Sequence, residues 1–298
     1  MRIWNRVRNS LAALGMALFA SGAGSATPPT ARPAMWKVAD ADTTIYLFGT
    51  IHLLPPGTKW RSPAFDAAAA GSDTLVVETL IDEKHPETTI GELFKLAVSP
   101  GLPPLAARVK PARRAALAKA IANSGLPARA FDRLETWAAG FLLLGAQFKA
   151  IGLDSGSGVE TALKQQFEAG GKSIAQLETN AEQLSFFDKL SEATQREFLD
   201  GVLDDPATMK AQFGTMLAAW SKGNVAAMAK SFNDELDDSP EMLDALLARR
   251  NANWARWVTG RLAKPGTVLV AVGAGHLAGD KSVVKLLQKQ GVNVRRIQ

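Results

Sequence analysis

The chain has 298 residues, 47% of them hydrophobic and 21% charged, which is enough apolar material for a sizeable core. Its formal charge is +5, but three of its arginines lie in the first ten residues, and without them the charge is +2. So small a net charge removes the main support for nucleic-acid binding. Because the chain has no cysteine, disulfide frameworks, thiolate metal ligands, thiol nucleophiles and lipid-modified N-terminal cysteines are excluded.

Residues 1–26 have the pattern of a cleaved signal peptide. A start with three arginines and no acid precedes an apolar run over residues 11–20. The run is shorter than the roughly 20 residues that span a bilayer, so cleavage is favoured over anchoring. Small residues at 24–26 offer a signal peptidase site. We therefore expect a periplasmic or secreted protein that begins near Thr27 and keeps no transmembrane anchor.

The mature chain opens with strands and a helix in alternation. Ser62 and Pro63 suit the N-cap and first position of a helix. The order of elements predicts a hairpin followed by a βαβ unit, in which ligands gather at the carboxyl ends of parallel strands. The expected elements are strands at 35–39 and 44–48, a helix at 62–70 and a strand at 74–77.

The middle of the chain is predicted to be helical, over about 86–150 and 181–258. Between these stretches we expect a helix at 159–168 and a strand at 172–177. A strand at 267–272, a helix at 281–290 and a strand at 292–297 predict a second βαβ unit. The sequence thus predicts one α/β domain over residues 27–298. Its central, mostly parallel sheet is built from the N- and C-terminal βαβ units, with large helical insertions between them.

Two of the three histidines share one local pattern. Each follows an apolar strand in the sequence G-x-x-H-L, as Gly49 to Leu53 and as Gly273 to Leu277. A glycine allows unusual backbone conformations and close approach to a ligand, so Gly49 and Gly273 are reserve site candidates. His52 and His276 would then emerge at the carboxyl edge of the sheet. The alternative is two structural histidines that donate to backbone carbonyls.

Glu78 also follows a strand that is predicted to be buried. A carboxylate there is costly unless it is paired, protonated or bound to a cation. With His52 and His276 it would complete a ligand set for a divalent metal with open positions. Without a metal the same groups could form a His/Glu acid–base pair. A salt bridge to a nearby Arg or Lys is the alternative for Glu78 alone.

Other polar residues have simpler interpretations. Glu160 and Glu182 each lie three residues after a Ser or Thr, which favours capping boxes at helix N-termini. Glu178 ends a strand as Glu78 does and is a reserve site candidate. His85 lies in a polar loop and is interpreted as an ordinary surface residue.

Two adjacent arginines, Arg249 and Arg250, follow an apolar helical stretch. One of them, directed at the site, could hold a substrate carboxylate or stabilise an oxyanion. From the residues alone, a helix-end arginine that pairs with an acid is the simpler interpretation, and which of the two faces the site stays open.

Several segments together resemble the TraB/GumN family, which includes PrgY and the TIKI proteins. The resemblance implies an EreA/ChaN-like α/β fold with the two histidines and the glutamate at strand ends. It also favours Arg250 over Arg249, because Arg250 directly precedes Asn251 as in the family's arginine–asparagine pair. The matching segments, in the family's order, are YLFGTIHLLP, LVVETLID, GLDSG, KSIAQLETNAEQ, LLARRNANW and VLVAVGAGHLAGDKSVVKLLQKQG.

The resemblance implies more than one function. TIKI-type members are metal-dependent proteases, TraB and PrgY limit peptide pheromone activity, ChaN-like relatives are linked to haem and EreA-like relatives to ester hydrolysis. The first hypothesis is an exported metal-dependent hydrolase acting on peptides or proteins. His52, Glu78 and His276 would bind Mn²⁺, Co²⁺ or Zn²⁺, with Glu78 and Arg250 in catalytic roles.

Two alternatives stay open. The chain could be a periplasmic peptide- or haem-binding protein without turnover, or an esterase-type hydrolase that needs no metal. The expected partner is a peptide or protein substrate rather than a nucleic acid. The sequence does not determine the oligomeric state.

Overall fold

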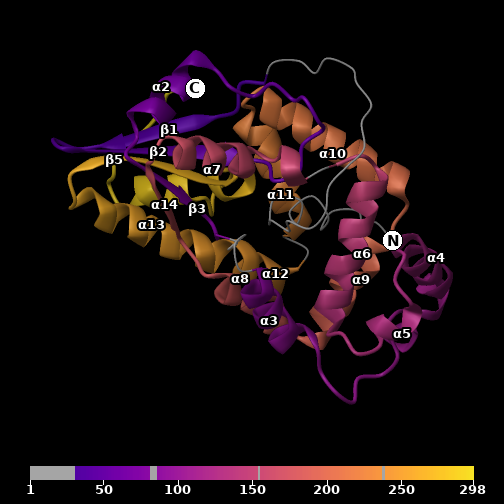
Figure 1. Cartoon of the computed structure of the whole chain (residues 1–298). Helices are drawn as coiled ribbons and strands as arrows, with labels where there is room; N and C mark the ends of the chain where they lie inside the picture. The colour runs from indigo at the N-terminus through magenta and orange to yellow at the C-terminus, as the bar shows by residue number, and fades with distance from the viewer. Residues whose placement is uncertain (1–30, 81–85, 154, 237–238) are drawn as a thin grey trace.

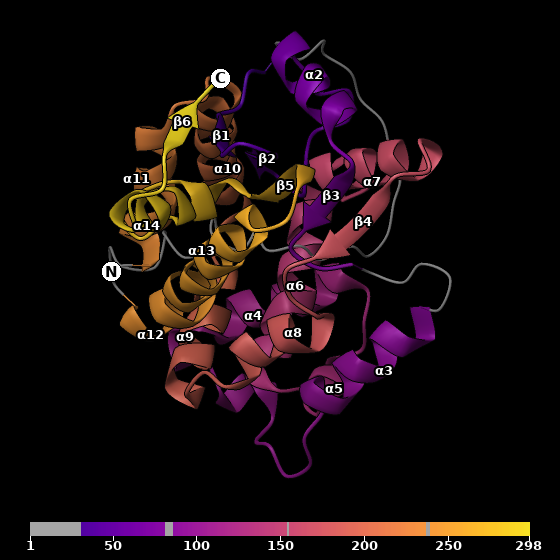
Figure 2. The same ribbon diagram turned by 90° about the vertical axis from the view of Figure 1, so that its left-hand side faces the viewer.

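The computed structural model describes residues 31–80, 86–153, 155–236 and 239–298. The predicted signal peptide and His85 lie outside these ranges. The family-like segments at the strand ends lie almost wholly within them. Figures 1 and 2 show a sheet flanked by helices on both faces, with a further group of helices beyond one edge of the sheet.

The described residues form a six-stranded sheet with the strand order β4-β3-β5-β2-β1-β6. The pairs β4–β3, β3–β5 and β5–β2 are parallel, and β1 is antiparallel to both β2 and β6. The predicted mixed but mostly parallel α/β fold is therefore confirmed. The strands are β1 (Met35–Ala39), β2 (Thr43–Thr50), β3 (Thr74–Val77), β4 (Ser173–Gln176), β5 (Gly266–Gly273) and β6 (Val294–Arg296).

Both predicted βαβ units are present, but neither joins neighbouring strands. β2, α2 (Pro63–Gly71) and β3 form the first unit, and β5 lies between its two strands. β5, α14 (Val283–Lys289) and β6 form the second, with β2 and β1 between its strands. The N- and C-terminal parts of the chain are thus interleaved in one sheet.

The central strands β3 and β5 are buried on both faces, which explains their continuous apolar sequences, whereas the edge strands β4 and β6 are more exposed. Successive side chains of β5 point to opposite faces, so Val268 and Val270 pack with α13 (Arg249–Leu262) and α14. Leu269 and Ala271 belong to the opposite layer, with side chains of α2 and α7 (Val159–Ala169). Ser62 caps α2 as predicted, since its hydroxyl accepts from the Phe65 N–H at 3.1 Å.

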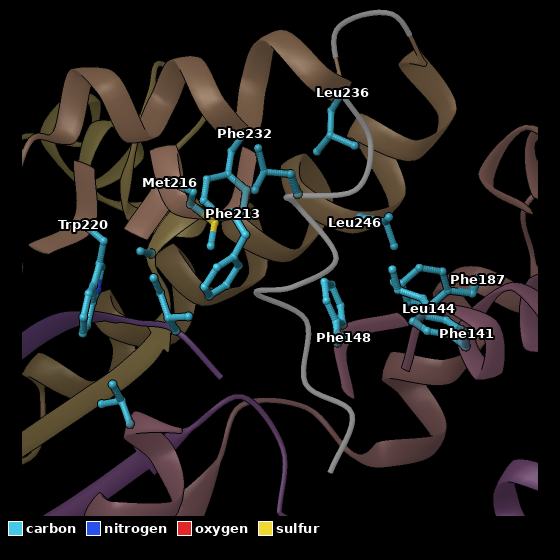
Figure 3. Close-up of a cluster of buried hydrophobic side chains, with 14 of the residues drawn as sticks. Phe141, Leu144, Phe148, Phe187, Phe213, Met216, Trp220, Phe232, Leu236 and Leu246 are labelled. Atoms are coloured by element: carbon cyan, nitrogen blue, oxygen red, sulfur yellow. The ribbon is translucent and has the colours of Figure 1, made fainter. Parts of the chain in front are cut away.

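The remaining helices form the predicted insertions. An aromatic group holds several of them together, for example Phe141 and Phe187 with ring centroids 4.5 Å apart (Figure 3). No helix of the described residues is long and apolar enough to cross a membrane. The helices are α3 (Pro86–Ala97), α4 (Arg114–Ser124), α5 (Ala128–Phe131), α6 (Thr136–Ala150), α8 (Asn180–Asp188), α9 (Glu192–Val202), α10 (Pro206–Ser221), α11 (Val225–Leu236) and α12 (Pro240–Leu243).

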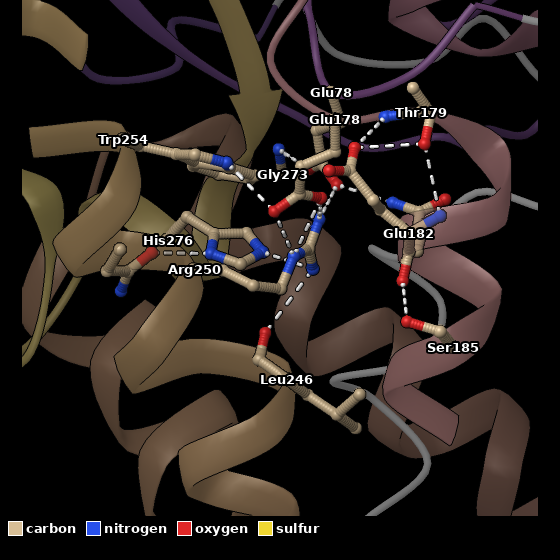
Figure 4. A network of polar contacts seen from close by, with 12 residues as sticks. Glu78, Glu178, Thr179, Glu182, Ser185, Leu246, Arg250, Trp254, Gly273 and His276 are labelled. Carbon is tan, nitrogen blue, oxygen red and sulfur yellow. Dashed lines mark hydrogen bonds and ion pairs between the residues drawn. The ribbon is translucent and has the colours of Figure 1, made fainter. Parts of the chain in front are cut away.

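The register of the parallel strands positions the site. β2 and β5 are paired to their last residues, with Thr50 opposite Gly273, and Val77 of β3 lies opposite Ala271. The residues that follow these strands must therefore leave the sheet at the same edge. This edge faces the N-terminal part of α13 and helix α8 (Figures 2 and 4).

Candidate active site

Four polar residues of the candidate site lie just after the ends of four strands. His52 follows β2, Glu78 follows β3, Glu178 follows β4, and His276 lies in the short 3₁₀ turn Ala274–Leu277 after β5. Arg250 reaches them from the first turn of α13 (Figure 4). Residues separated by more than 200 positions in the sequence thus meet at one edge of the sheet.

Arg250 is the centre of the network and is fully buried. Its Nε donates to both carboxylate oxygens of Glu178, at 3.0 Å each, and its Nη2 donates to Glu178 Oε2 at 2.8 Å and to Glu78 Oε2 at 2.7 Å. Its Nη1 donates to the Leu246 carbonyl at 3.3 Å and to His276 Nε2 at 3.1 Å. These contacts use all five N–H groups of the guanidinium.

Glu178 shares Arg250 with Glu78, so two carboxylates face one guanidinium. The indole N–H of Trp254 also donates to Glu178 Oε1, at 3.0 Å. Burial raises the pKa of Glu178, although Arg250 and the Trp254 hydrogen bond oppose that effect. The reserve candidate from the sequence is therefore part of the buried network.

Glu78 joins the network to His52. Its Oε1 accepts the backbone N–H of Gly273 at 2.7 Å, and its Oε2 accepts from Gln183 Nε2 at 3.2 Å besides Arg250. Its Oε1 lies 3.9 Å from His52 Nε2, which is beyond a direct hydrogen bond. A single small group that contacts both atoms would complete this connection.

His276 is buried and held at both ring nitrogens. Its Nδ1 lies 2.6 Å from Asn251 Oδ1, and the amide nitrogen of Asn251 donates to the Lys281 carbonyl at 2.8 Å. The ring therefore carries its proton on Nδ1, and Nε2 accepts from Arg250. Burial and then the Arg250 charge hold the pKa of His276 well below its ordinary value of 6.5. His276 is a neutral imidazole in this arrangement.

His52 has a different environment. Its Nδ1 lies 2.8 Å from Glu160 Oε1, which also accepts from the Thr50 hydroxyl. Burial alone would lower the pKa of His52, but the charges of Glu160 and Glu78 outweigh it and raise the pKa above 6.5. Within the described chain, His52 Nε2 has no hydrogen-bond partner. The His52 and Glu160 side chains are 12% and 18% exposed, more than the Arg250 side of the network.

The capping prediction was wrong for Glu160 and is confirmed for Glu182. Glu182 and Thr179 form a capping box at the start of α8. Helix α7 begins at Val159, but its N-cap is Gly158 rather than Ser157, and it has no side-chain cap. Glu160 contacts His52 instead, and the pairing lowers the pKa of Glu160 although burial alone would raise it.

Of the two arginines, the structure brings only Arg250 into the cluster. Arg249 is exposed and pairs with Asp244 at 2.7 Å. A π-helical turn over Asp244–Ala248 precedes them, and such turns are frequent at functional sites. Trp254, which binds Glu178, was not predicted from the sequence. Its spacing of four residues from Arg250 places it on the same helix face, and this spacing could have identified it.

Gly49 and Gly275, one in each G-x-x-H segment, contribute by close packing rather than by unusual backbone angles. Neither Gly49 nor Gly273 has a positive φ. A Cβ on Gly49 would lie 3.1 Å from Ala274, and a Cβ on Gly275 would lie 2.8 Å from the Phe232 ring. The Gly49 carbonyl also accepts from the Trp220 indole N–H at 2.8 Å. The two segments therefore pack tightly against each other and against α10 and α11.

The side chains do not fit the predicted metal site in their present arrangement. A metal held by His52, Glu78 and His276 would need the lone pair of His276 Nε2, which accepts from Arg250. The same guanidinium also binds Glu78 Oε2, and a cation that close would repel a metal ion. In the part of the chain that the structure describes, no three His, Asp or Glu side chains are grouped to hold a metal ion. Metal binding stays a prediction, and it requires Arg250 to move.

A comparison with protein families gives one match. The model of the TraB/PrgY/gumN family matches residues 34–296, which include all the strands and the whole candidate site. Among curated proteins and among solved structures, none matches the chain. The family match agrees with the resemblance seen in the motifs. The chain therefore belongs to the TraB/PrgY/gumN family.

Proposed function

We propose that this protein is an exported hydrolase in which His52 is the general base, with peptides as the substrate class. One observation carries the proposal. Glu160 binds His52 Nδ1 at 2.8 Å, and within the described chain His52 Nε2 is left without a partner. A carboxylate that orients an imidazole and stabilises its charged form is a recurring arrangement in hydrolases. Of the options raised by the sequence, this geometry favours a hydrolase that needs no metal.

The chemistry follows from the positions of His52 and Glu78. Their atoms Nε2 and Oε1 are 3.9 Å apart, so one water molecule can lie at about 2.8 Å from both. His52 Nε2 would take a proton from this water as its oxygen forms a bond with the substrate carbonyl carbon. The imidazolium, stabilised by Glu160, would return the proton to the leaving nitrogen or oxygen as the old bond breaks. The sum is hydrolysis of an amide or ester bond.

Arg250 has a positioning role in this proposal instead of the substrate-binding role expected from the sequence. Its five N–H groups already have protein acceptors, and its side chain is fully buried. It fixes Glu78 opposite His52 and keeps His276 neutral. A substrate carbonyl could reach it only by displacing one of these acceptors.

Peptide substrates and export rest on the sequence. Peptides are the substrate class that the family resemblance implies, and the pattern of residues 1–26 supports export. N-terminal sequencing of protein from the periplasm should give a start near Thr27. Protein that keeps Met1 in that fraction would contradict cleavage of a signal peptide.

A substrate screen with a chelator tests the proposed function. The mature protein is incubated with a peptide library and a panel of aryl esters, with and without EDTA, beside the variants His52→Ala and Arg249→Ala. We expect cleavage that survives EDTA and Arg249→Ala and is lost in His52→Ala. Cleavage that EDTA abolishes and Mn²⁺ restores would support the metal-dependent hypothesis instead. Cleavage unchanged in His52→Ala would overturn the role of His52.

A further inference from the structure

Three metal-capable side chains converge on Arg250. Glu78, Glu178 and His276 each place an acceptor atom within 3.1 Å of a guanidinium nitrogen. They come from three different strand ends, so the sheet itself sets their spacing. Two carboxylates and one imidazole are a typical ligand set for a divalent ion, and here they surround a side-chain cation.

The orientation of His276 supports the same conclusion. Asn251 binds its Nδ1 and so directs the Nε2 lone pair toward the centre of the group. Ligating histidines are held in the same way in metal sites, where the second nitrogen donates to an outer acceptor. The Nε2 lone pair thus has the orientation that it would have toward a bound metal, and it accepts a hydrogen bond from Arg250 Nη1.

The balance of charge is also that of a cation site. Glu78 and Glu178 together bring two carboxylates to one guanidinium, and His276 adds an imidazole nitrogen at 3.1 Å. His52, 3.9 Å from Glu78, pairs with Glu160 instead, so Arg250 is the cation in direct contact with both carboxylates. Without Arg250, the two buried carboxylates would need another cation or a proton.

We propose that Arg250 is a built-in cation that takes the place of a divalent metal, and that it masks a metal site formed by Glu78, Glu178 and His276. Replacement of Arg250 by a small residue removes the bound cation and its hydrogen bonds to all three side chains. A shift of the ligands toward the centre then allows bonds of about 2.0–2.2 Å to a Zn²⁺ or Co²⁺ ion. The natural chain, by contrast, needs no divalent metal at this position. This inference rests on the geometry alone and does not depend on hydrolysis.

Metal binding by variants tests the inference without any activity assay. Mature wild-type protein, Arg250→Ala and the neighbouring control Arg249→Ala are dialysed against Co²⁺ and then against metal-free buffer. Elemental analysis and visible absorption measure the bound ion. We expect about one Co²⁺ per chain in Arg250→Ala only, with d–d absorption bands of a protein-bound ion. Adding His276→Ala to Arg250→Ala should weaken the binding by at least about tenfold.

The stability of Arg250→Ala is measured at the same time, because loss of the buried partner of Glu78 and Glu178 destabilises the fold. If the variant is unfolded without metal, we expect Co²⁺ to restore its far-UV circular dichroism. Failure to bind Co²⁺, or to refold in excess Co²⁺, would overturn the masked metal site. A tightly bound ion in the wild-type protein that is lost in His276→Ala would overturn the role of Arg250 as its replacement.

Discussion

The two G-x-x-H segments have the same sequence pattern and end neighbouring strands, yet their histidines differ in every contact that sets their charge. At His52 a carboxylate holds Nδ1 and Nε2 has no partner in the described chain. At His276 a neutral amide holds Nδ1 and a guanidinium donates to Nε2. One pKa is raised and the other is lowered well below 6.5. A shared motif therefore fixes the position of an imidazole, while residues elsewhere in the chain decide its chemistry.

The two histidines should also affect stability with opposite signs. Because the pKa of His52 is raised, its contribution is complete below 6.5 and is lost as the pH rises through the raised value. Because the pKa of His276 is lowered, the unfolded chain takes up its proton first, so stability is lost as the pH falls below 6.5. Glu160 has a lowered pKa, and its contribution is present above 4.5 and lost as the pH falls through the lowered value.

The largest expected effect comes from exchanging each histidine for glutamine. His52→Gln should lower kcat/KM by about 10²–10⁴-fold, because the general base is lost. His276→Gln should have a smaller effect on activity, because its amide oxygen can still accept from Arg250. Steady-state kinetics of both variants on the substrate found in the screen measure the difference. Equal losses would contradict the division of roles.

The next largest effect concerns the network that keeps His276 neutral. Arg250→Met leaves Glu78 and Glu178 buried without their partner and should destabilise the fold by about 3–5 kcal/mol. Arg249→Met, one residue away and exposed, should change stability by less than about 0.5 kcal/mol. Urea unfolding of both variants at neutral pH makes the comparison. Similar small changes in the two would show that the network does not stabilise the fold.

Packing between the two segments can be tested at their glycines. Gly49→Ala brings a methyl group to 3.1 Å from Ala274 and should cost about 1–3 kcal/mol. Gly145→Ala in helix α6, where a Cβ has no atom within 4 Å, should be neutral or slightly stabilising. Thermal unfolding of the two variants gives the result. A Gly49→Ala protein as stable as the wild type would mean that the segments can move apart at no cost.

The smallest expected effect comes from Glu160→Gln, which gives His52 Nδ1 a neutral amide partner like the one that His276 has. Glu160→Gln keeps a side chain of the same shape but removes the carboxylate, so the pKa of His52 should fall and the activity should decrease by about tenfold. The stability difference from the wild type should be greatest between 4.5 and 6.5, where Glu160 and His52 are both charged. Unfolding measured across this pH range checks the sign. A difference that grows above 6.5 instead would contradict the ion pair.

Much of this arrangement could be predicted from the sequence. Strand ends in a parallel sheet meet at one edge, so the positions of His52, Glu78, Glu178 and His276 followed from the strand pattern alone. The family's arginine–asparagine pair pointed to Arg250. Both βαβ units were predicted, but not the interleaving of their strands, because strand order depends on pairings distant in sequence.

Glu160 was missed for a local reason. The segment from Ser157 to Glu160 has the capping-box pattern, but the N-cap of α7 is Gly158 instead of Ser157, and the carboxylate of Glu160 contacts His52. A shift of one residue at a helix terminus is within the ordinary uncertainty of helix ends. The unequal charges of the two histidines were also beyond the sequence, because they depend on contacts between α7, α13 and the sheet.

The most direct measurement is a pH titration of the histidine side chains by NMR, with the signals assigned through His52→Gln and His276→Gln. The account predicts that the His52 signal titrates above pH 6.5 and that the His276 signal stays in its neutral form down to the onset of acid unfolding. Two signals that titrate together near 6.5 would contradict it. That result would mean that Glu160 does not raise the pKa of His52 and that Arg250 does not lower the pKa of His276.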